Sequence, residues 1–167
     1  MKKRLVFICG TMGVGKTTVS RSLQSNIENC VFLDGDWCFD FHPFTVTDET
    51  KQMILENISF LLRQFLNCSL CQTVLFCWVM HEQQIIDAIL SALPVSDCDV
   101  FVFRLTCTQK DLRTRLQKDI QAGKRTPDVI ERSIARLPFY ESVHAICIDT
   151  TDRTIEQITQ EILTCLS

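Results

Sequence analysis

The sequence predicts an α/β fold in three layers, with a five-stranded parallel sheet and helices on both of its faces. Two observations carry this prediction. Five short apolar runs alternate along the chain with segments of helical spacing, which is the pattern of strands joined by crossover helices. In addition, a glycine-rich segment, Gly10-Thr-Met-Gly-Val-Gly-Lys-Thr17, lies directly between the first apolar run and the first helical segment.

The apolar runs have the length of buried strands and little internal alternation of polar and apolar residues. Such runs are typical of parallel strands that helices cover on both faces. We predict strands at Leu5–Cys9, Val31–Leu33, Thr73–Val79, Val100–Leu105 and Ala145–Ile148.

The first three helical segments follow the first three strands. In the helix after the glycine-rich segment, Val19, Leu23 and Ile27 share one face. The second helix is expected from about Asp48 to Asn67, with Thr47 or Asp48 as its cap. The third is expected from about Glu82 to Leu93, where Pro94 follows.

Three more helices carry start signals. Thr108-Gln-Lys-Asp111 resembles a capping box, and Thr126-Pro127 places a cap residue before a proline at the first helical position. The last helix is expected to begin near Thr154 and to turn Ile155, Ile158 and Ile162 inward.

Length and composition favour one soluble globular domain over residues 1–167. The formal net charge is −3 and no long basic run occurs, which argues against nucleic acid as a partner. No apolar run is long enough to cross a membrane or to form the core of a signal peptide, so we expect a cytoplasmic protein, either a monomer or a homodimer.

Ten cysteines are many for 167 residues. Cys9, Cys77, Cys107 and Cys147 fall in or beside apolar runs, where a reduced thiol acts as a small apolar side chain, so disulfides are not expected. Cys68-Ser-Leu-Cys71 has the spacing of a metal-ligand pair, but no second pair accompanies it, and packing at a helix end explains it better.

The glycine-rich segment has the spacing Gly-x₄-Gly-Lys-Thr of a phosphate-binding loop, in the required place between a strand and a helix. Its glycines allow the backbone amides to turn toward a phosphate, Lys16 would reach the β- and γ-phosphates, and the Thr17 hydroxyl would bind Mg²⁺. We therefore predict nucleotide binding by Gly10, Met12, Gly13, Val14, Gly15, Lys16, Thr17 and Thr18.

Two carboxylates follow the second predicted strand, in Leu33-Asp34-Gly35-Asp36. Ligands of open α/β sheets bind at this edge. We assign Asp34 to the metal ion and Asp36 to the acceptor hydroxyl as a proton acceptor, with the reverse assignment left open, as is a plain Asp-Gly turn. The third strand is followed by no acid before Glu82, which adds weight to this pair.

Five cations surround the connection between the fourth and fifth helices, between Arg113 and Arg125. We interpret residues 116–127 as a short helical lid that would bring positive charge over a bound triphosphate and exclude water. Arg115 is assigned to stacking on the base, and Lys124 and Arg125 to the phosphates, Arg125 as a catalytic residue. A solvated, charged helix face is the alternative.

Aromatic residues interleave with acids between Asp34 and Phe44, the start of the expected acceptor-side segment 34–67. Trp37 and Phe41, together with Asp36, are our candidate substrate contacts for a flat or amphipathic acceptor. Packing of the second helix onto the sheet would give the same pattern. His81 fits a helix cap better than a ligand contact, and Arg104, if buried, is expected to pair with a carboxylate. Asp149-Thr-Thr151 fits an adenine pocket or a capping turn equally well.

With the Gly10–Thr17 loop, the Asp34-Gly-Asp36 pair and the cationic segment from Leu112 to Arg115, the chain resembles the small P-loop kinases related to shikimate, gluconate and nucleoside monophosphate kinases, and the AAA-type ATP-binding proteins of that kind. The resemblance spans the whole chain. It implies the P-loop NTPase fold with strand order 2-3-1-4-5, ATP and Mg²⁺ as the phosphoryl donor, and a small acceptor beneath the second helix.

The sequence departs from these families at two places. Lys118 and Asp119 stand where nucleoside monophosphate kinases carry a further lid arginine, and Cys77-Trp-Val-Met80 supplies none of the polar anchors that bind acidic substrates after the third strand. We therefore expect a kinase acting on a nucleoside, a nucleotide or an aromatic natural product. The alternatives are an ATP-binding regulatory switch without an acceptor and a metal- or redox-active protein centred on Cys68 and Cys71.

Overall fold

The computed structural model describes residues 2–167 and contains one five-stranded sheet in the order β2-β3-β1-β4-β5. All neighbouring strands are parallel. The strands are β1 (Lys3–Cys9), β2 (Cys30–Asp34), β3 (Thr73–Cys77), β4 (Cys98–Thr106) and β5 (Ile146–Asp149). This order and these layers confirm the predicted three-layer α/β fold.

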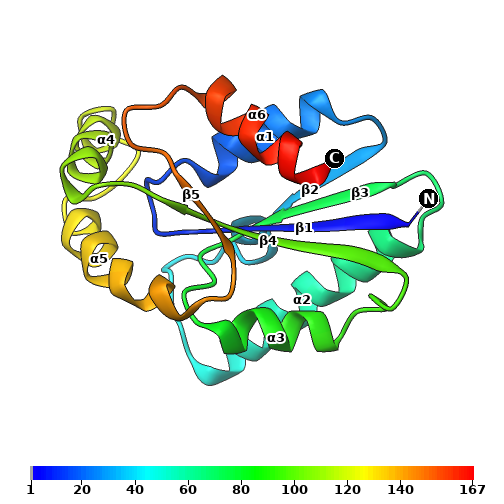
Figure 1. Cartoon of the computed structure of the whole chain (residues 1–167). Coiled ribbons are helices and arrows are strands. Elements are labelled where there is room, and N and C mark those ends of the chain that lie inside the picture. Colours follow the sequence, from blue (N-terminus) through cyan, green and yellow to red (C-terminus); the bar gives the residue numbers. More distant parts are fainter. Residues whose placement is uncertain (1) are drawn as a thin grey trace.

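Helices cover both faces of the sheet (Figure 1). α1 and α6 pack on one face, α2 and α3 on the other, and α4 and α5 lie at the edge where the strands end. The helices are α1 (Lys16–Asn26), the 3₁₀ helix η1 (Gly35–Cys38), α2 (Asp48–Asn67), α3 (Gln83–Ser91), α4 (Gln109–Gln121), α5 (Val129–Arg136), the 3₁₀ helix η2 (Leu137–Ser142) and α6 (Ile155–Leu166).

β1 is the centre of the core, with Leu5 to Cys9 fully buried. Because successive side chains of a strand point to opposite faces, Val6 and Ile8 join the cluster under α1 and α6, whereas Leu5, Phe7 and Cys9 join the cluster under α2 and α3. Each side of the sheet therefore has its own apolar layer, and the phosphate-binding loop leaves the sheet from its most buried strand.

The strand bounds differ slightly from the predicted ones. β3 ends at Cys77 because its last pairing, with Asp34, coincides with the end of β2 at the start of η1. Trp78 still donates its backbone N–H to the Ile8 carbonyl (3.2 Å), but Val79 no longer belongs to the strand. β4 begins two residues earlier than expected because Cys98 pairs with Lys3 of β1.

Three threonine caps fix helix starts as expected. Thr47 and Thr154 each form a complete capping box, at the start of α2 and of α6, and the Thr108 side chain accepts a hydrogen bond from the Asp111 N–H at the start of α4. The cap predicted at Thr126 is wrong. The Thr126 hydroxyl bonds the Asp128 carboxylate instead, and α5 begins at Val129 with Asp128 at its N-cap.

Between residues 2 and 167, no helix combines the length and the apolar character that crossing a membrane requires.

Candidate active site

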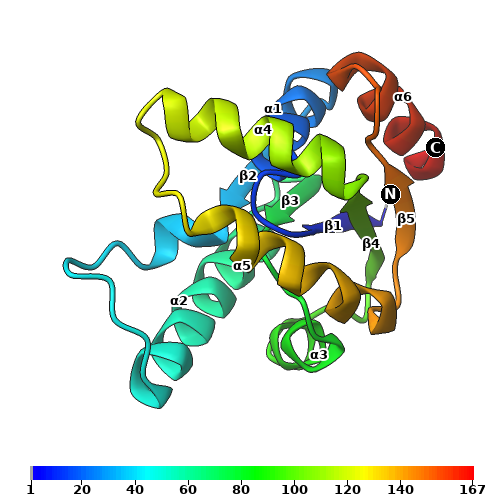
Figure 2. The same cartoon turned by 90° about the vertical axis from the view of Figure 1, so that its left-hand side faces the viewer.

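A cleft of about 460 Å³ lies at the edge of the sheet where the strands end. Its floor is the loop between β1 and α1, and its walls come from the ends of β2 and β3, from α4 and the connection after it, and from the start of α6. Figure 2 looks onto this edge, with α4 and α5 in front of the strands. The lining residues are Met12 to Val19, Asp34, Asp36, Trp78, Val79, Arg115, Asp119, Arg125, Arg153, Ile155 and Ile158.

At two glycines of the loop, any other residue would have a strained backbone, and its side chain would meet a neighbouring group. Gly10 has φ +148°, and a Cβ there would lie 2.7 Å from the Leu105 carbonyl oxygen of β4. Gly13 has φ +82°, and its Cβ would lie 2.5 Å from Leu116 Cδ2 of α4. The loop is thus packed closely between β4 and α4.

Lys16 is the first residue of α1 and folds back over the loop. Its Nζ donates to the carbonyl oxygens of Gly10 (2.8 Å) and Thr11 (3.0 Å). Burial lowers the pKa of Lys16, while the Asp36 and Asp34 carboxylates act in the opposite direction. The ammonium group therefore lies at the centre of the phosphate-binding loop, where a bound phosphate would add the negative charge that stabilises it.

The start of α1 is open to an anion. Its N-cap residue, Gly15, makes no side-chain capping bond, and no atom lies within 4 Å of the place where a Cβ on Gly15 would stand. The first amides of a helix without such a cap bind a phosphate well because the helix dipole adds positive charge there. These residues fit a nucleotide phosphate.

Thr17 and Asp34 meet across the floor of the cleft. The Thr17 hydroxyl donates to Asp34 Oδ2 (2.7 Å), and the other oxygen, Oδ1, accepts the backbone N–H of Asp36 (3.1 Å). A hydroxyl and a carboxylate are ligands of Mg²⁺. Asp34 is 5% exposed and fixed at both oxygens, so the pair fits a metal ion held beside the loop.

Asp36 lies on η1, directly after β2, and its side chain borders the cleft. Partial burial and the neighbouring Asp34 carboxylate raise the pKa of Asp36, while the charge of Lys16, the nearby Trp78 indole and the charge of Arg125 act in the opposite direction. Asp34 and Asp36 thus have different roles available: Asp34 is engaged by the loop, and Asp36 faces the space above it.

Arg115 of α4 is held by hydrogen bonds to three residues. Its guanidinium donates to the Val14 carbonyl (3.1 Å), to the hydroxyl and the carbonyl of Thr150 (2.9 and 2.7 Å), and to the Asp111 carboxylate (2.8 Å). The side chain borders the cleft in this fixed position. Stacking of its plane on a base stays a prediction, and the structure adds that Arg115 joins α4 to the loop and to the segment after β5.

The predicted lid corresponds to the end of α4 and the connection that leads to α5. Arg125 borders the cleft, with its Nε 3.2 Å from Asp119 Oδ2, whereas Lys124 lines a separate shallow hollow beside it. Asp119, which seemed to interrupt the pattern of lid cations, therefore orients Arg125. Of the cations assigned to the phosphates, the structure brings Lys16 and Arg125 to the cleft and leaves Lys124 outside its lining.

Trp37 and Phe41, the predicted aromatic contacts of the substrate, do not line this cleft. Trp37 packs edge-on against Phe32 (ring centroids 5.3 Å apart), with the Arg21 guanidinium 5.0 Å from its ring. Phe41 stacks on Phe39 in the segment between η1 and α2, which projects from the body of the protein in Figure 2. Both side chains are 53% exposed, and their role in binding stays a prediction.

Trp78 is a lining residue that the sequence reasoning missed. Its ring packs so closely on Gly35 that a Cβ there would lie 2.5 Å from Trp78 Cγ. The available signal was Gly35 itself: a glycine between two site carboxylates indicates close approach by another group. The strand predicted to extend to Val79 included Trp78, and no role in the site was assigned to this residue.

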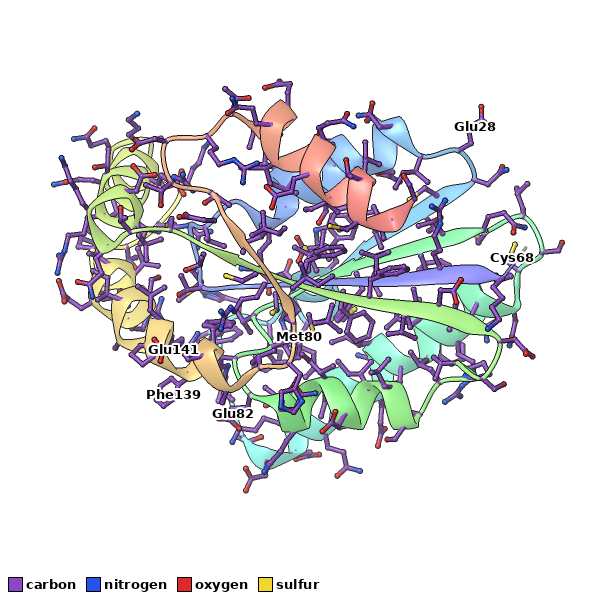
Figure 3. All side chains as sticks on the ribbon, viewed as in Figure 1. Glu28, Cys68, Met80, Glu82, Phe139 and Glu141 are labelled. Atoms are coloured by element: carbon purple, nitrogen blue, oxygen red, sulfur yellow. The ribbon has the colours of Figure 1, made fainter. Side chains whose placement is uncertain are left out.

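Arg104 and His81 lie outside the lining of the cleft and contact residues of η2. The carboxylate partner predicted for Arg104 is wrong, because its guanidinium donates to the Tyr140 carbonyl, a backbone group of η2. His81 lies 3.4 Å from Glu82 and packs against Phe139 and Tyr140. Burial, followed by the charge of Arg136, lowers the pKa of His81. Glu82 and Phe139, labelled in Figure 3, mark this region below the end of β4.

The Cys68–Cys71 pair lies far from the cleft. Cys68 caps the end of α2 at the opposite end of the molecule from α4 and α5 (Figure 3), and its carbonyl accepts the Cys71 N–H (3.2 Å) in a tight turn. In the described part of the chain, no three His, Cys, Asp or Glu side chains are grouped so that they could hold a metal ion.

The phosphate-binding loop follows the central strand, a lysine folds over the loop, and a carboxylate is bonded to the threonine of the loop. These features define a P-loop nucleotide-binding protein of the small kinase-like type. A family model described as an AAA domain matches residues 6–136, and the chain belongs to this family. A search of the curated proteins finds no match to the sequence.

Several solved structures share the fold over nearly the whole chain. A gluconokinase from Sinorhizobium meliloti is 17% identical, with a TM-score of 0.72 over 98% of this chain and 91% of its own. A sugar kinase from a Janibacter species is 16% identical, with a TM-score of 0.71 over 98% and 94%. A shikimate kinase from Acinetobacter baumannii, solved with shikimate, is 20% identical, with a TM-score of 0.61 over 98% and 93%. At these identities the likeness shows the fold.

Proposed function

We propose that the protein is an ATP-dependent kinase that transfers the γ-phosphoryl group to a hydroxyl of a small molecule. The observation that carries this proposal is that the two carboxylates have different surroundings. Asp34 is fixed by the Thr17 hydroxyl and the Asp36 N–H, while the Asp36 side chain borders the cleft. A nucleotide switch needs only a carboxylate that holds the metal ion, as Asp34 would, whereas a kinase also needs a group that orients an acceptor. The similar structures include sugar, gluconate and shikimate kinases, which supports this class.

The donor side of the proposed reaction uses the loop and two cations. The amides of the loop and of the first turn of α1 would bind the phosphates, with Lys16 Nζ moving from the Gly10 and Thr11 carbonyls onto phosphate oxygens. Arg125, oriented by Asp119, would lie over the transferring group. Positive charge at these two positions stabilises the charge that develops on the phosphoryl oxygens.

Thr17 and Asp34 would hold Mg²⁺ beside the loop. When bound there, the ion would neutralise charge shared by the β- and γ-phosphates. Arg115, bonded to both Val14 and Thr150, keeps the loop and the segment after β5 in place around the nucleotide.

On the acceptor side, Asp36 would accept a hydrogen bond from the substrate hydroxyl and take its proton as the oxygen bonds to phosphorus. Burial and the Asp34 charge raise the pKa of Asp36, which makes it a better proton acceptor than an ordinary aspartate. Its ionised form is still required, so the rate should fall toward acid pH.

The test is phosphoryl transfer by wild type and the Asp36→Asn variant, measured with labelled ATP and a panel of nucleosides, sugars and aromatic alcohols. We expect Asp36→Asn to lower kcat by about 10²- to 10⁴-fold while the Kd for ATP changes little. Asp40→Asn is the matched control, because Asp40 is exposed on the same segment and does not line the cleft. Full activity in Asp36→Asn would refute the role of this carboxylate.

A regulatory switch without an acceptor is the weaker candidate. Its main support is the lack of an acid among Trp78 and Val79, the cleft residues that follow β3. The Thr17–Asp34 pair supplies a carboxylate from β2 instead, so a metal ion needs none after β3. ATP binding with no transfer to any compound of the panel would favour the switch.

A further inference from the structure

The order of the strands divides the cleft into two halves. β2 and β3 lie on one side of β1, and β4 and β5 lie on the other. Arg115 and Arg153 border the cleft on the β4–β5 side, since Arg153 donates to the Asp149 carbonyl at the end of β5 and Arg115 to the carbonyl of the next residue, Thr150. This half faces the base end of a nucleotide whose phosphates lie on the loop after β1.

The other half, at the ends of β2 and β3, is where an acceptor would lie. Its lining residues are Asp34, Asp36, Trp78 and Val79. This surface therefore consists of two carboxylates, one indole and one small apolar side chain. None of these four residues carries a positive charge.

Trp78 is held rigidly in this surface. Its backbone N–H donates to the Ile8 carbonyl of β1 (3.2 Å), and its ring presses on the backbone of Gly35, the residue directly before Asp36. An aromatic ring fixed in this way loses no rotamer freedom when a ligand packs on it, which favours binding. The fixed ring and the proposed proton acceptor thus border the same part of the cleft.

Charge at this surface disfavours an anionic acceptor. Arg125, which reaches toward Asp36 from the connection after α4, is already paired with Asp119 at 3.2 Å, and Lys16 would be engaged by the donor phosphates. A carboxylate or phosphate on the acceptor would meet Asp34 and Asp36 without a free cation among the lining residues of this half. Like charges in such a site are destabilising, and they discriminate between ligands.

We propose that the acceptor is an uncharged alcohol with a planar ring, that its ring packs against Trp78, and that its hydroxyl faces Asp36. Nucleosides, pyridine alcohols and phenolic glycosides have this chemistry; sugar acids and nucleoside monophosphates do not. The proposal rests on the kinase function proposed above and specifies the substrate class of the same site.

The first experiment compares matched acceptors in the ATP-dependent transfer assay. Thymidine and thymidine 5′-monophosphate share a ring and differ in charge; pyridoxine tests a second planar alcohol, and gluconate and shikimate represent non-aromatic acids. We expect transfer to at least one planar uncharged alcohol with a kcat/KM about 100-fold or more above that for the acids. Preferred transfer to gluconate, shikimate or the monophosphate would overturn the proposal and leave the kinase function standing. Transfer to no compound, with ATP still bound, counts against both.

The second experiment uses the accepted alcohol and substitutions of the two tryptophans. Trp78→Leu should raise its KM by about 5- to 100-fold, the range expected when one ring-stacking contact is lost, with the Kd for ATP unchanged as evidence of folding. Trp78→Phe keeps a ring at this position, so it should restore most of the affinity that Trp78→Leu loses. Trp37→Leu tests the other tryptophan as the ring that binds the acceptor. An increase in KM for Trp37→Leu, with none for Trp78→Leu, would overturn the assignment of Trp78 as the acceptor contact.

Discussion

The Arg115 guanidinium donates two hydrogen bonds to one residue, Thr150, at 2.9 Å to its hydroxyl and 2.7 Å to its carbonyl. Thr150 is fully buried and in turn donates its hydroxyl to the Thr106 carbonyl at the end of β4. Through this pair α4 is connected to β4 and to the segment that leads into α6. The β4–β5 side of the cleft is therefore held together by the Arg115 side chain.

Arg115→Ala should lower the free energy of unfolding by about 2 kcal/mol, because it leaves buried acceptors without a charged donor. It should also weaken ATP binding, since the Val14 carbonyl loses its tie to α4. The matched control is Arg113→Ala, whose surface pair with Glu131 is expected to contribute less than about 1 kcal/mol. Denaturant unfolding and ATP titration measure both effects; equal losses in the two variants would contradict this view of Arg115.

Lys16→Ala should weaken ATP binding by about 10- to 100-fold, the loss expected for one charge-assisted contact to phosphate. Lys118→Ala removes an exposed lysine of α4 that does not line the cleft, and it controls for the change in net charge. Isothermal titration with ATP and Mg²⁺ gives both Kd values. An unchanged Kd in Lys16→Ala would show that this lysine does not bind the nucleotide.

Asp36→Asn should stabilise the protein without ligand at neutral pH. Because the folded pKa of Asp36 is raised, the folded state binds more protons than the unfolded state between the ordinary pKa of 3.8 and the folded value. The contribution of Asp36 to stability therefore falls as pH rises through this window. Melting temperatures at pH 7.5 and 4.5 should show a larger advantage of Asp36→Asn at pH 7.5; an advantage confined to pH 4.5 would reverse the sign.

Gly13→Ala and Gly123→Ala separate backbone strain from steric overlap. Both glycines have positive φ, +82° and +69°, but only at Gly13 would a Cβ meet another group, Leu116 Cδ2 at 2.5 Å. Gly123→Ala should cost about 1 kcal/mol of strain, and Gly13→Ala about 2 to 4 kcal/mol as well as ATP affinity. Thermal unfolding compares the two. A larger loss in Gly123→Ala would mean that α4 yields to the added methyl group.

A Cys68→Ser, Cys71→Ser double variant tests the remaining alternative function. The pair lies in a turn at the end of the molecule opposite the cleft, so we expect unchanged ATP binding and transfer activity. Native mass spectrometry of the wild-type protein should show no bound zinc. Loss of activity in the double variant, or a stoichiometric metal ion, would revive a cysteine-centred function.

The fold could be predicted from sequence because its signals are local. Apolar runs, threonine caps and the glycine loop each specify a strand, a helix start or a turn without reference to distant residues, and the parallel order came with the family resemblance. One wrong helix cap also had a local cause: the Thr126 hydroxyl bonds the nearby Asp128 carboxylate instead of capping a backbone amide of α5.

The site was predictable in part for the same reason. The loop, Asp34 and Asp36 are short-range patterns, and they meet at one cleft. Trp78 was missed because its place in the cleft depends on its contact with Gly35, which follows a different strand, β2. The periodicity of the sequence cannot predict such a contact between distant segments. Trp37 was chosen for its place beside Asp36 in the sequence, yet a 3₁₀ turn directs it toward Phe32 and Arg21.

The placement of β1 between the two pairs of strands has a consequence for how the proposed kinase could diverge. Residues that would contact the acceptor come from the ends of β2 and β3, whereas those around the base come from α4 and the segment after β5. Exchanging residues 37–47 and 78–82 with those of another protein of this fold would then change the acceptor of the proposed reaction, while Asp34 and the phosphate-binding loop stay in place. The proposed kinase would then be modular across its central strand, and new substrates could be acquired without rebuilding the residues that bind ATP.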